Sequence, residues 1–130
     1  MRDYQRSGDD GQKLEPDIYF RTLWVIRGYY RMKEDAEAIL HESPGPSDGM
    51  PRAINNISDP NAAKAIKREE LVRQIDAVDK ALLIVPTEYR KGVWQNILDH
   101  SPYPLDAGTA TYGRWRIRFI REVARRLNIV

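Results

Sequence analysis

Apolar residues recur every three or four positions along most of the chain after residue 16, and this spacing places them on one face of a helix. The first such segment spans residues 17–42, with Asp17 as a candidate N-cap. Gly28 lies inside the segment, so the segment forms either one long helix or two short ones. The apolar residues expected on its inner face are Leu23, Ile26 and Tyr30.

A further helix is predicted from Pro60 to about Val85. Asp59 can accept hydrogen bonds from the free amides of the first turn, and a proline at the first helical position lacks a donor that would otherwise be orphaned. The apolar residues of this helix alternate spacings of four and three and form one seam: Leu71, Ile75, Val78, Leu82 and Val85. Because the repeat lasts only two heptads, we expect a core-facing bundle helix rather than an extended coiled coil.

The next helix follows Pro86, which ends the preceding one, and Thr87 is its expected cap. It covers residues 88–100, and its inward-facing side chains are expected to be Val93, Trp94, Ile97 and Leu98. No segment of the chain shows strand alternation with hairpin turns. The sequence therefore predicts an all-α fold, a small domain of four to five helices.

Two segments lack a helical pattern. Residues 1–16 mix charges with glycines without periodicity, so we expect a flexible N-terminal tail. Residues 43–60 contain four prolines and two glycines, which no regular helix or central strand tolerates. This long loop either packs across the surface or contacts a partner, and its composition agrees with both.

The last helix, expected to begin between Thr109 and Tyr112 and to end at Leu127, contains six arginines. Four of them fall within about 60° of one another on a helical wheel and form what we call the arginine row: Arg114, Arg118, Arg121 and Arg125. Large apolar residues cluster on the opposite side: Tyr112, Trp115, Phe119, Ile120, Val123 and Leu127. Arg116 points toward this apolar side, so we expect it either to extend outward or to pair with an acid.

Two interpretations of the arginine row are open. Rows of charge are usually solvated faces, and this one could also pair with acids of the preceding helices or of an acidic protein. Against that, Glu122 is the only acid after residue 108, and every basic residue there is arginine, whose forked guanidinium suits phosphates and base edges. Residues 109–130 carry a net charge of +5, whereas the rest of the chain carries −3. The pattern favours contact with nucleic acid.

Composition argues against several other classes of protein. The chain has no cysteine, which excludes disulfides and thiolate metal sites and favours a reducing compartment. The N-terminal residues lack the apolar core of a signal peptide, and no run approaches the roughly 20 apolar residues of a membrane span. We therefore expect a cytoplasmic protein without a membrane partner. His41 and His100 are isolated and lack ligand spacing, so we expect no metal and no other cofactor.

The sequence also lacks the patterns of a catalytic site, namely a glycine-rich phosphate loop, a nucleophile elbow or a spaced Ser–His–Asp set. Its paired acids lie on a helix rich in Lys and Arg and are expected to be solvated, so we do not expect an enzyme. Each tryptophan lies within an apolar helical pattern and is expected to anchor the core, although an aromatic residue of the first helix could also stack on a base or a partner. The tryptophans are Trp24, Trp94 and Trp115.

Two stretches carry a resemblance to a known family. IDAVDKALLIVPTEYRKGVWQNI and TYGRWRIRFIREVARRL resemble the C-terminal half of phage-encoded transcription regulators of the RinA and ArpU type and, more distantly, the sigma-factor region that binds promoter DNA. The resemblance extends from Leu71 to the C-terminus. In these proteins a helix ending near a proline leads into a helix-turn-helix. The recognition-helix pattern corresponds here to Thr111, Tyr112, Arg114, Phe119, Ile120 and Leu127.

The resemblance implies a DNA-binding transcription regulator of phage origin, with double-stranded DNA as ligand and with RNA polymerase and a second copy of the chain as candidate partners. It implies a helix-turn-helix-like part over residues 61–130. The length of the chain predicts that this part belongs to a single helical domain of residues 17–130. The implied DNA-contacting residues are Thr109, Thr111, Tyr112 and Arg114 near bases and phosphates, and Arg118, Arg121 and Arg125 along the backbone.

The sequence departs from this family in one respect. Only a short segment with two prolines separates the helix that contains Trp94 from the arginine-rich helix. The first helix of the motif is therefore either reduced to about one turn around Leu105 or replaced by the helix from Glu88. The alternative to a regulator is a helical interaction, assembly or packaging protein whose basic helix binds an acidic partner or nucleic acid without sequence preference.

Overall fold

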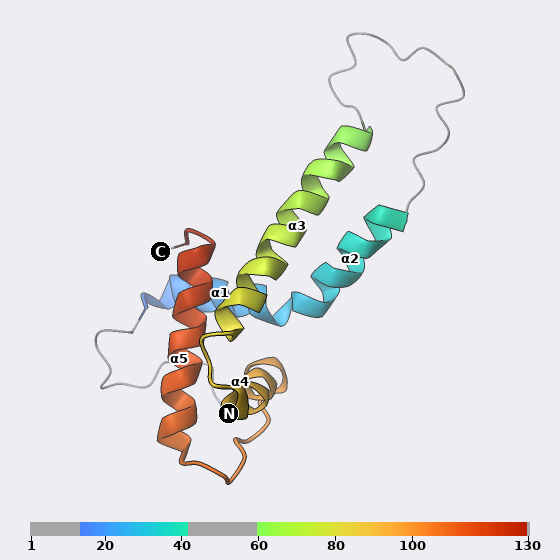
Figure 1. Ribbon diagram of the computed structural model, residues 1–130. Coiled ribbons are helices and arrows are strands. Elements are labelled where there is room, and N and C mark those ends of the chain that lie inside the picture. The colour runs from blue at the N-terminus through green and yellow to red at the C-terminus, as the bar shows by residue number, and fades with distance from the viewer. Residues whose placement is uncertain (1–13, 42–59, 130) are drawn as a thin grey trace, which may run out of the picture.

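The computed structural model describes residues 14–41 and 60–129, and these residues form helices and short connections with no strand (Figure 1). This confirms the all-α fold. The structure contains five helices in these ranges: α1 (Pro16–Arg27), α2 (Tyr29–His41), α3 (Pro60–Leu82), α4 (Thr87–Asp99) and α5 (Thr109–Arg126). The predicted tail and the predicted loop lie outside the described residues, apart from residues 14–16 and Pro60.

The N-terminal segment forms two helices, α1 and α2, which meet at Gly28. The amide of Gly28 donates to the carbonyl oxygens of Trp24 and Val25, which closes α1, and α2 begins at the next residue. Helix α1 begins at Pro16 and places Asp17 in the first turn, so the predicted cap at Asp17 is wrong. Leu14, which lies within the predicted tail, is buried against the core.

The change of direction at Gly28 also decides which tyrosine enters the core. Tyr29 is buried and its hydroxyl donates to Asp79 of α3 at 2.6 Å, whereas 56 % of Tyr30 is exposed. A continuous helix would have turned Tyr30 inward with Leu23 and Ile26, which are both buried as predicted. The prediction for Tyr30 is wrong because the helical phase restarts after Gly28.

Helix α3 is shorter than predicted, and a turn joins it to α4. Helix α3 ends at Leu82, and residues 83–85 form a turn. The Arg90 guanidinium stabilises this turn by donating to the carbonyl oxygens of Leu83 and Val85. Val85 is nevertheless fully buried, so the seam continues beyond the helix. Thr87 is the first residue of α4 rather than its cap, and Pro86 occupies the cap position without a side-chain hydrogen bond.

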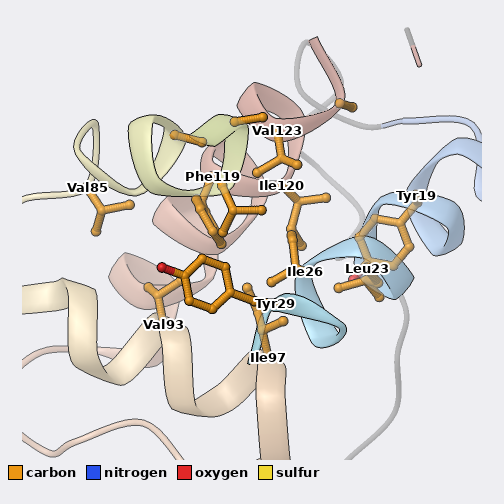
Figure 2. Close-up of a cluster of buried hydrophobic side chains, with 14 of the residues drawn as sticks. Tyr19, Leu23, Ile26, Tyr29, Val85, Val93, Ile97, Phe119, Ile120 and Val123 are labelled. Atoms are coloured by element: carbon orange, nitrogen blue, oxygen red, sulfur yellow. The ribbon is translucent and has the colours of Figure 1, made fainter. Parts of the chain in front are cut away.

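Helices α1, α4 and α5 pack together with the C-terminal end of α3, while α2 packs mainly along α3 and the two extend away from the other helices as an arm (Figure 1). Figure 2 shows side chains of α1, α2, α4 and α5 converging in the core with Val85. Burial of each such side chain contributes about 1.5–3 kcal/mol to folding. The labelled members are Tyr19, Leu23, Ile26, Tyr29, Val85, Val93, Ile97, Phe119, Ile120 and Val123.

The three tryptophans differ in their burial. Trp94 and Trp115 are half-buried and pack against the core, and the Trp94 Nε1–H donates to the Tyr30 hydroxyl at 3.1 Å. Trp24 is 71 % exposed, so the prediction that it anchors the core is wrong. It lies on the outer face of α1 with Phe20, one helical turn earlier, which is 48 % exposed.

Candidate nucleic-acid interface

Helix α5 is defined at both ends by local backbone chemistry. It starts after Gly108, whose carbonyl accepts from the amide of Thr111 at 3.0 Å. At the other end Asn128 takes the left-handed conformation, with φ of 57°. The amides of Asn128 and Ile129 then donate to the carbonyl oxygens of Arg125 and Ala124, which is the Schellman arrangement that satisfies the last carbonyls of a helix.

The two faces of α5 differ as the helical wheel predicted. All four members of the arginine row are exposed. On the opposite face the predicted apolar residues are buried, except Trp115, which is half-buried at the edge between the faces. The inward face packs against α1, α3 and α4, so the arginine row is held on a rigid support (Figure 1).

Members of the row differ in their neighbours. The Arg118 Cζ lies 4.9 Å from the centroid of the Trp115 ring, a cation–π contact that restricts the guanidinium. Arg125 donates to both carboxylate oxygens of Glu122, at 2.5 and 3.1 Å, and Arg126 donates to the same carboxylate at 2.8 Å. Because the hydrogen bond from Arg125 stabilises the ionised carboxylate, the pKa of Glu122 lies below its usual value. Glu122 therefore neutralises part of the positive charge at the C-terminal end of the row.

Arg116 behaves differently from both expectations. Only 7 % of it is exposed, so it does not extend into solvent, and it makes no ion pair with an acid of the described residues. Instead its Nη1–H donates to the Tyr19 hydroxyl at 2.5 Å, with the guanidinium 5.9 Å from the centre of that ring. The Arg116 Nε has no hydrogen-bond partner in residues 14–41 and 60–129. Both expectations were wrong because Arg116 lies near the middle of the face that packs on α1.

The N-terminal turns of α5 hold the other residues implied to contact DNA. Thr109 and Arg114 are exposed and Thr111 is half-buried. Tyr112 is fully buried, and its hydroxyl donates to Asp106 at 2.6 Å. Burial, followed by this hydrogen bond, raises the pKa of Tyr112 to about 12. The implied contact of Tyr112 with bases is wrong because its side chain faces the core.

Tyr112 instead organises the connection between α4 and α5. The ring of Tyr103 stacks on it at a centroid distance of 5.0 Å with 10° between the planes. Gly92 of α4 lies so close that an added Cβ would be 2.6 Å from the Tyr112 ring and 2.8 Å from Pro104. Sequence reasoning missed these roles, although the combination of Gly92 within a helix and two prolines beside a tyrosine was a signal of close packing.

Residues 105–107 form a turn and a bend rather than a helical turn, so the reduced first helix expected around Leu105 is wrong. Helix α4 is therefore the helix that precedes α5. Its C-terminus is closed by His100 in the left-handed conformation and by Arg27, whose Nε–H donates to the Ile97 carbonyl at 2.7 Å. His41 is exposed at the end of α2, 3.8 Å from a carboxylate oxygen of Glu37.

Within the described part of the chain, no three His, Cys, Asp or Glu side chains gather as metal ligands. Among the helices of these ranges, none combines the length and apolar character needed to cross a bilayer. Comparison with protein-family models, curated proteins and solved structures finds no match for the chain. The arginine row on α5, supported by a fully packed inner face, is the feature on which a functional argument rests.

Proposed function

We propose that the protein binds double-stranded DNA through the arginine row of α5 and acts as a transcriptional regulator of phage origin rather than as an enzyme. The single observation that carries DNA binding is the exposure of all four row arginines on a helix whose opposite face is buried. The packed helix fixes the backbone of the row before binding, and the planar guanidinium loses less side-chain freedom per hydrogen bond to phosphate than a lysine ammonium does. The regulatory role follows from the resemblance of residues 71–130 to phage regulators.

The dimensions of the row suit a duplex. Arg114 and Arg125 are eleven residues apart, which corresponds to about 16 Å along a helix axis. Phosphates of one strand advance about 3.4 Å per base pair, so the row spans roughly five base-pair steps. Thr109 and Thr111 lie at the N-terminal end, where the helix dipole favours an anion. Arg114, Arg118 and Arg121 are assigned to phosphates or base edges, and Arg125 contributes less because Glu122 binds it.

Fluorescence-anisotropy titration with duplex DNA at several salt concentrations tests this proposal. Three to four phosphate contacts give a slope of log K against log salt between about −2.7 and −3.6. The double variant Arg118→Ala/Arg121→Ala is expected to bind at least about ten-fold more weakly, with a slope flatter by about 1.8. The matched control is Arg21→Ala/Arg31→Ala, which removes the same charge from exposed arginines of α1 and α2.

The control should bind DNA nearly as well as the wild type, and all three proteins should have the same helical content. Equal affinity of the wild type and the Arg118/Arg121 variant would refute the assignment. A preferred sequence over competitor DNA would support a regulator, whereas equal binding to all sequences would favour a packaging role. RNA polymerase and a second copy of the chain are the candidate partners of such a regulator to be tested next.

A second candidate function is that of a helical interaction protein. The observation that favours it is the exposed aromatic pair Phe20 and Trp24 on the outer face of α1, since exposed aromatic residues are typical of protein interfaces. Absence of DNA binding at low salt would favour the interaction protein, in which the arginine row would bind an acidic protein. Salt-dependent binding to DNA that needs Arg118 and Arg121 would exclude it as the role of α5.

A further inference from the structure

Arg116 of α5 and Tyr19 of α1 form a pair of polar side chains inside the packing between these two helices. Only 7 % of Arg116 and 2 % of Tyr19 are exposed. The Arg116 Nη1–H donates to the Tyr19 hydroxyl at 2.5 Å, and the guanidinium lies 5.9 Å from the centre of that ring. The pair takes no part in the proposed contact with DNA, because the arginine row lies on the opposite face of α5.

The pair offers more hydrogen-bond donors than the surrounding residues accept. A guanidinium carries only donors, and a phenol that accepts one hydrogen bond still has its own O–H to donate. Within residues 14–41 and 60–129, the one hydrogen bond of Arg116 is that to Tyr19, and the Tyr19 hydroxyl donates to no acceptor. The Arg116 Nε is buried and also has no acceptor in these ranges. Buried donors that lie so close together suit a ligand with several acceptor lone pairs.

The charge of Arg116 indicates that this ligand is an anion. Arginine keeps its positive charge when it is buried, and no carboxylate of the described part of the chain forms an ion pair with Arg116. A buried charge without an opposite charge is costly, so an anion bound here would stabilise the folded state. Because so little of Arg116 is exposed, the site takes one small group rather than an extended surface.

Among small anions, a carboxylate matches the pair best. Its single negative charge balances one guanidinium, and its two oxygens accept two parallel N–H groups. Phosphate carries more than one negative charge near neutral pH and would leave an excess of charge in this buried place.

We infer that Arg116 and Tyr19 form a binding site for one carboxylate group. The Nε–H and a neighbouring Nη–H of Arg116 donate to the two carboxylate oxygens, and the Tyr19 O–H donates to one of them. The inference does not depend on DNA binding. The carboxylate belongs either to a small acid from solution or to this chain, because Leu14, buried in the same cluster as Tyr19, is joined to residues that contain aspartates. These are Asp3, Asp9 and Asp10.

The experiment titrates the full chain with acetate, against chloride at equal ionic strength, and follows the arginine Nε–Hε signals by NMR. The Arg116 signal is expected to exchange slowly with water, because its Nε is buried, and to shift with acetate. Arg116→Met identifies this signal by its absence. Tyr19→Phe should bind acetate at least about ten-fold more weakly, because it lacks one hydrogen bond to a charged group. Acetate at about five times its Kd should raise the Tm of the wild type by about 4 °C and leave that of Arg116→Met unchanged.

Arg118→Ala/Arg121→Ala is the matched control, because it removes two exposed arginines of the same helix. It should respond to acetate as the wild type does. An equal rise in the Tm of the wild type and of Arg116→Met would overturn the site, because the exposed arginines would then account for it. A tighter response to phosphate than to acetate would overturn the assignment to a carboxylate.

A variant that combines Asp3→Asn, Asp9→Asn and Asp10→Asn distinguishes the two sources of the carboxylate. If an aspartate of the chain occupies the site, the wild type will not respond to acetate, whereas this variant will respond and will melt at a lower temperature without acetate. If the acid comes from solution, both proteins will respond equally. Absence of a shift of the Arg116 signal in both proteins would overturn the inference and would leave DNA binding by the arginine row unaffected.

Discussion

The outward and inward faces of α5 carry the same residue type in opposite surroundings. Outward, the guanidinium groups of the arginine row are exposed, and one of them stacks on Trp115. Inward, Arg116 lies among apolar side chains with one hydrogen bond, to the Tyr19 hydroxyl. The comparison shows that position on the wheel, rather than residue type, separates the exposed arginines from the one that belongs to the packing.

The inward face should dominate the stability of the fold. Phe119 is fully buried in the core, and replacing it with alanine removes most of a large side chain and leaves a cavity. We expect Phe119→Ala to lower the free energy of unfolding by about 3–5 kcal/mol. Urea unfolding followed by circular dichroism measures this change.

Arg114→Ala is the control from the outward face and should change the free energy of unfolding by less than about 0.5 kcal/mol. Similar losses in both variants would show that the two faces do not differ in this way. Trp115→Ala should fall between them, because Trp115 is half-buried and also supports Arg118.

A second inward residue gives the protein a measurable response to alkaline pH. An unfolded tyrosine ionises near its ordinary pKa of 10.0, whereas folded Tyr112 keeps its proton until about pH 12. Its contribution to stability is therefore fully present below pH 10 and is lost as the pH rises toward 12. Tyr112→Phe should cost about 1 kcal/mol at pH 7, from the lost hydrogen bond to Asp106, and should lose less stability between about pH 10 and 11.5.

Urea unfolding at a series of pH values tests this expectation. Burial and a hydrogen bond to Asp79 also raise the pKa of Tyr29, so the variant should retain part of the alkaline loss. Identical pH profiles for the wild type and Tyr112→Phe would contradict the assigned protonation of Tyr112.

On the outward face, Glu122 is the group that limits the charge of the row. Its pKa is lowered by the hydrogen bond from Arg125, so it is ionised at neutral pH and binds Arg125 and Arg126. Under the proposed function, Glu122→Gln should raise DNA affinity about three-fold and steepen the salt slope by up to about 0.9, because it releases these guanidinium groups. Glu69→Gln, an exposed acid of α3, is the control and should bind as the wild type. Equal slopes in the two variants would show that Arg125 does not reach a phosphate.

Much of this arrangement follows from the sequence. The seam of α3, the exposed row and the buried side of α5 obey the helical period, which is a local property of the chain. The burial of Tyr29 in place of Tyr30 does not, because it depends on how the chain restarts after Gly28. The packing of Tyr112 against Tyr103 is likewise a contact between segments, and periodicity carries no information about it.

Replacement of Arg116, the inward arginine, is expected to have the smallest effect on the free energy of unfolding. A buried guanidinium with one hydrogen bond and an Nε without a partner in the described residues recovers little of its hydration energy. Methionine has a similar length and no charge, so Arg116→Met should change the free energy of unfolding by less than about 1 kcal/mol and leave DNA affinity unchanged.

A double-mutant cycle with Tyr19→Phe isolates the one hydrogen bond that Arg116 makes. Tyr19→Phe should destabilise the wild type by about 1 kcal/mol, because it leaves the guanidinium without that acceptor, and should have almost no effect in the Arg116→Met background. A loss above about 2 kcal/mol in Arg116→Met would show that the charge itself is compensated in the folded protein. Weaker DNA binding by Arg116→Met at unchanged stability would break the comparison, because the inward arginine would then act on the outward face.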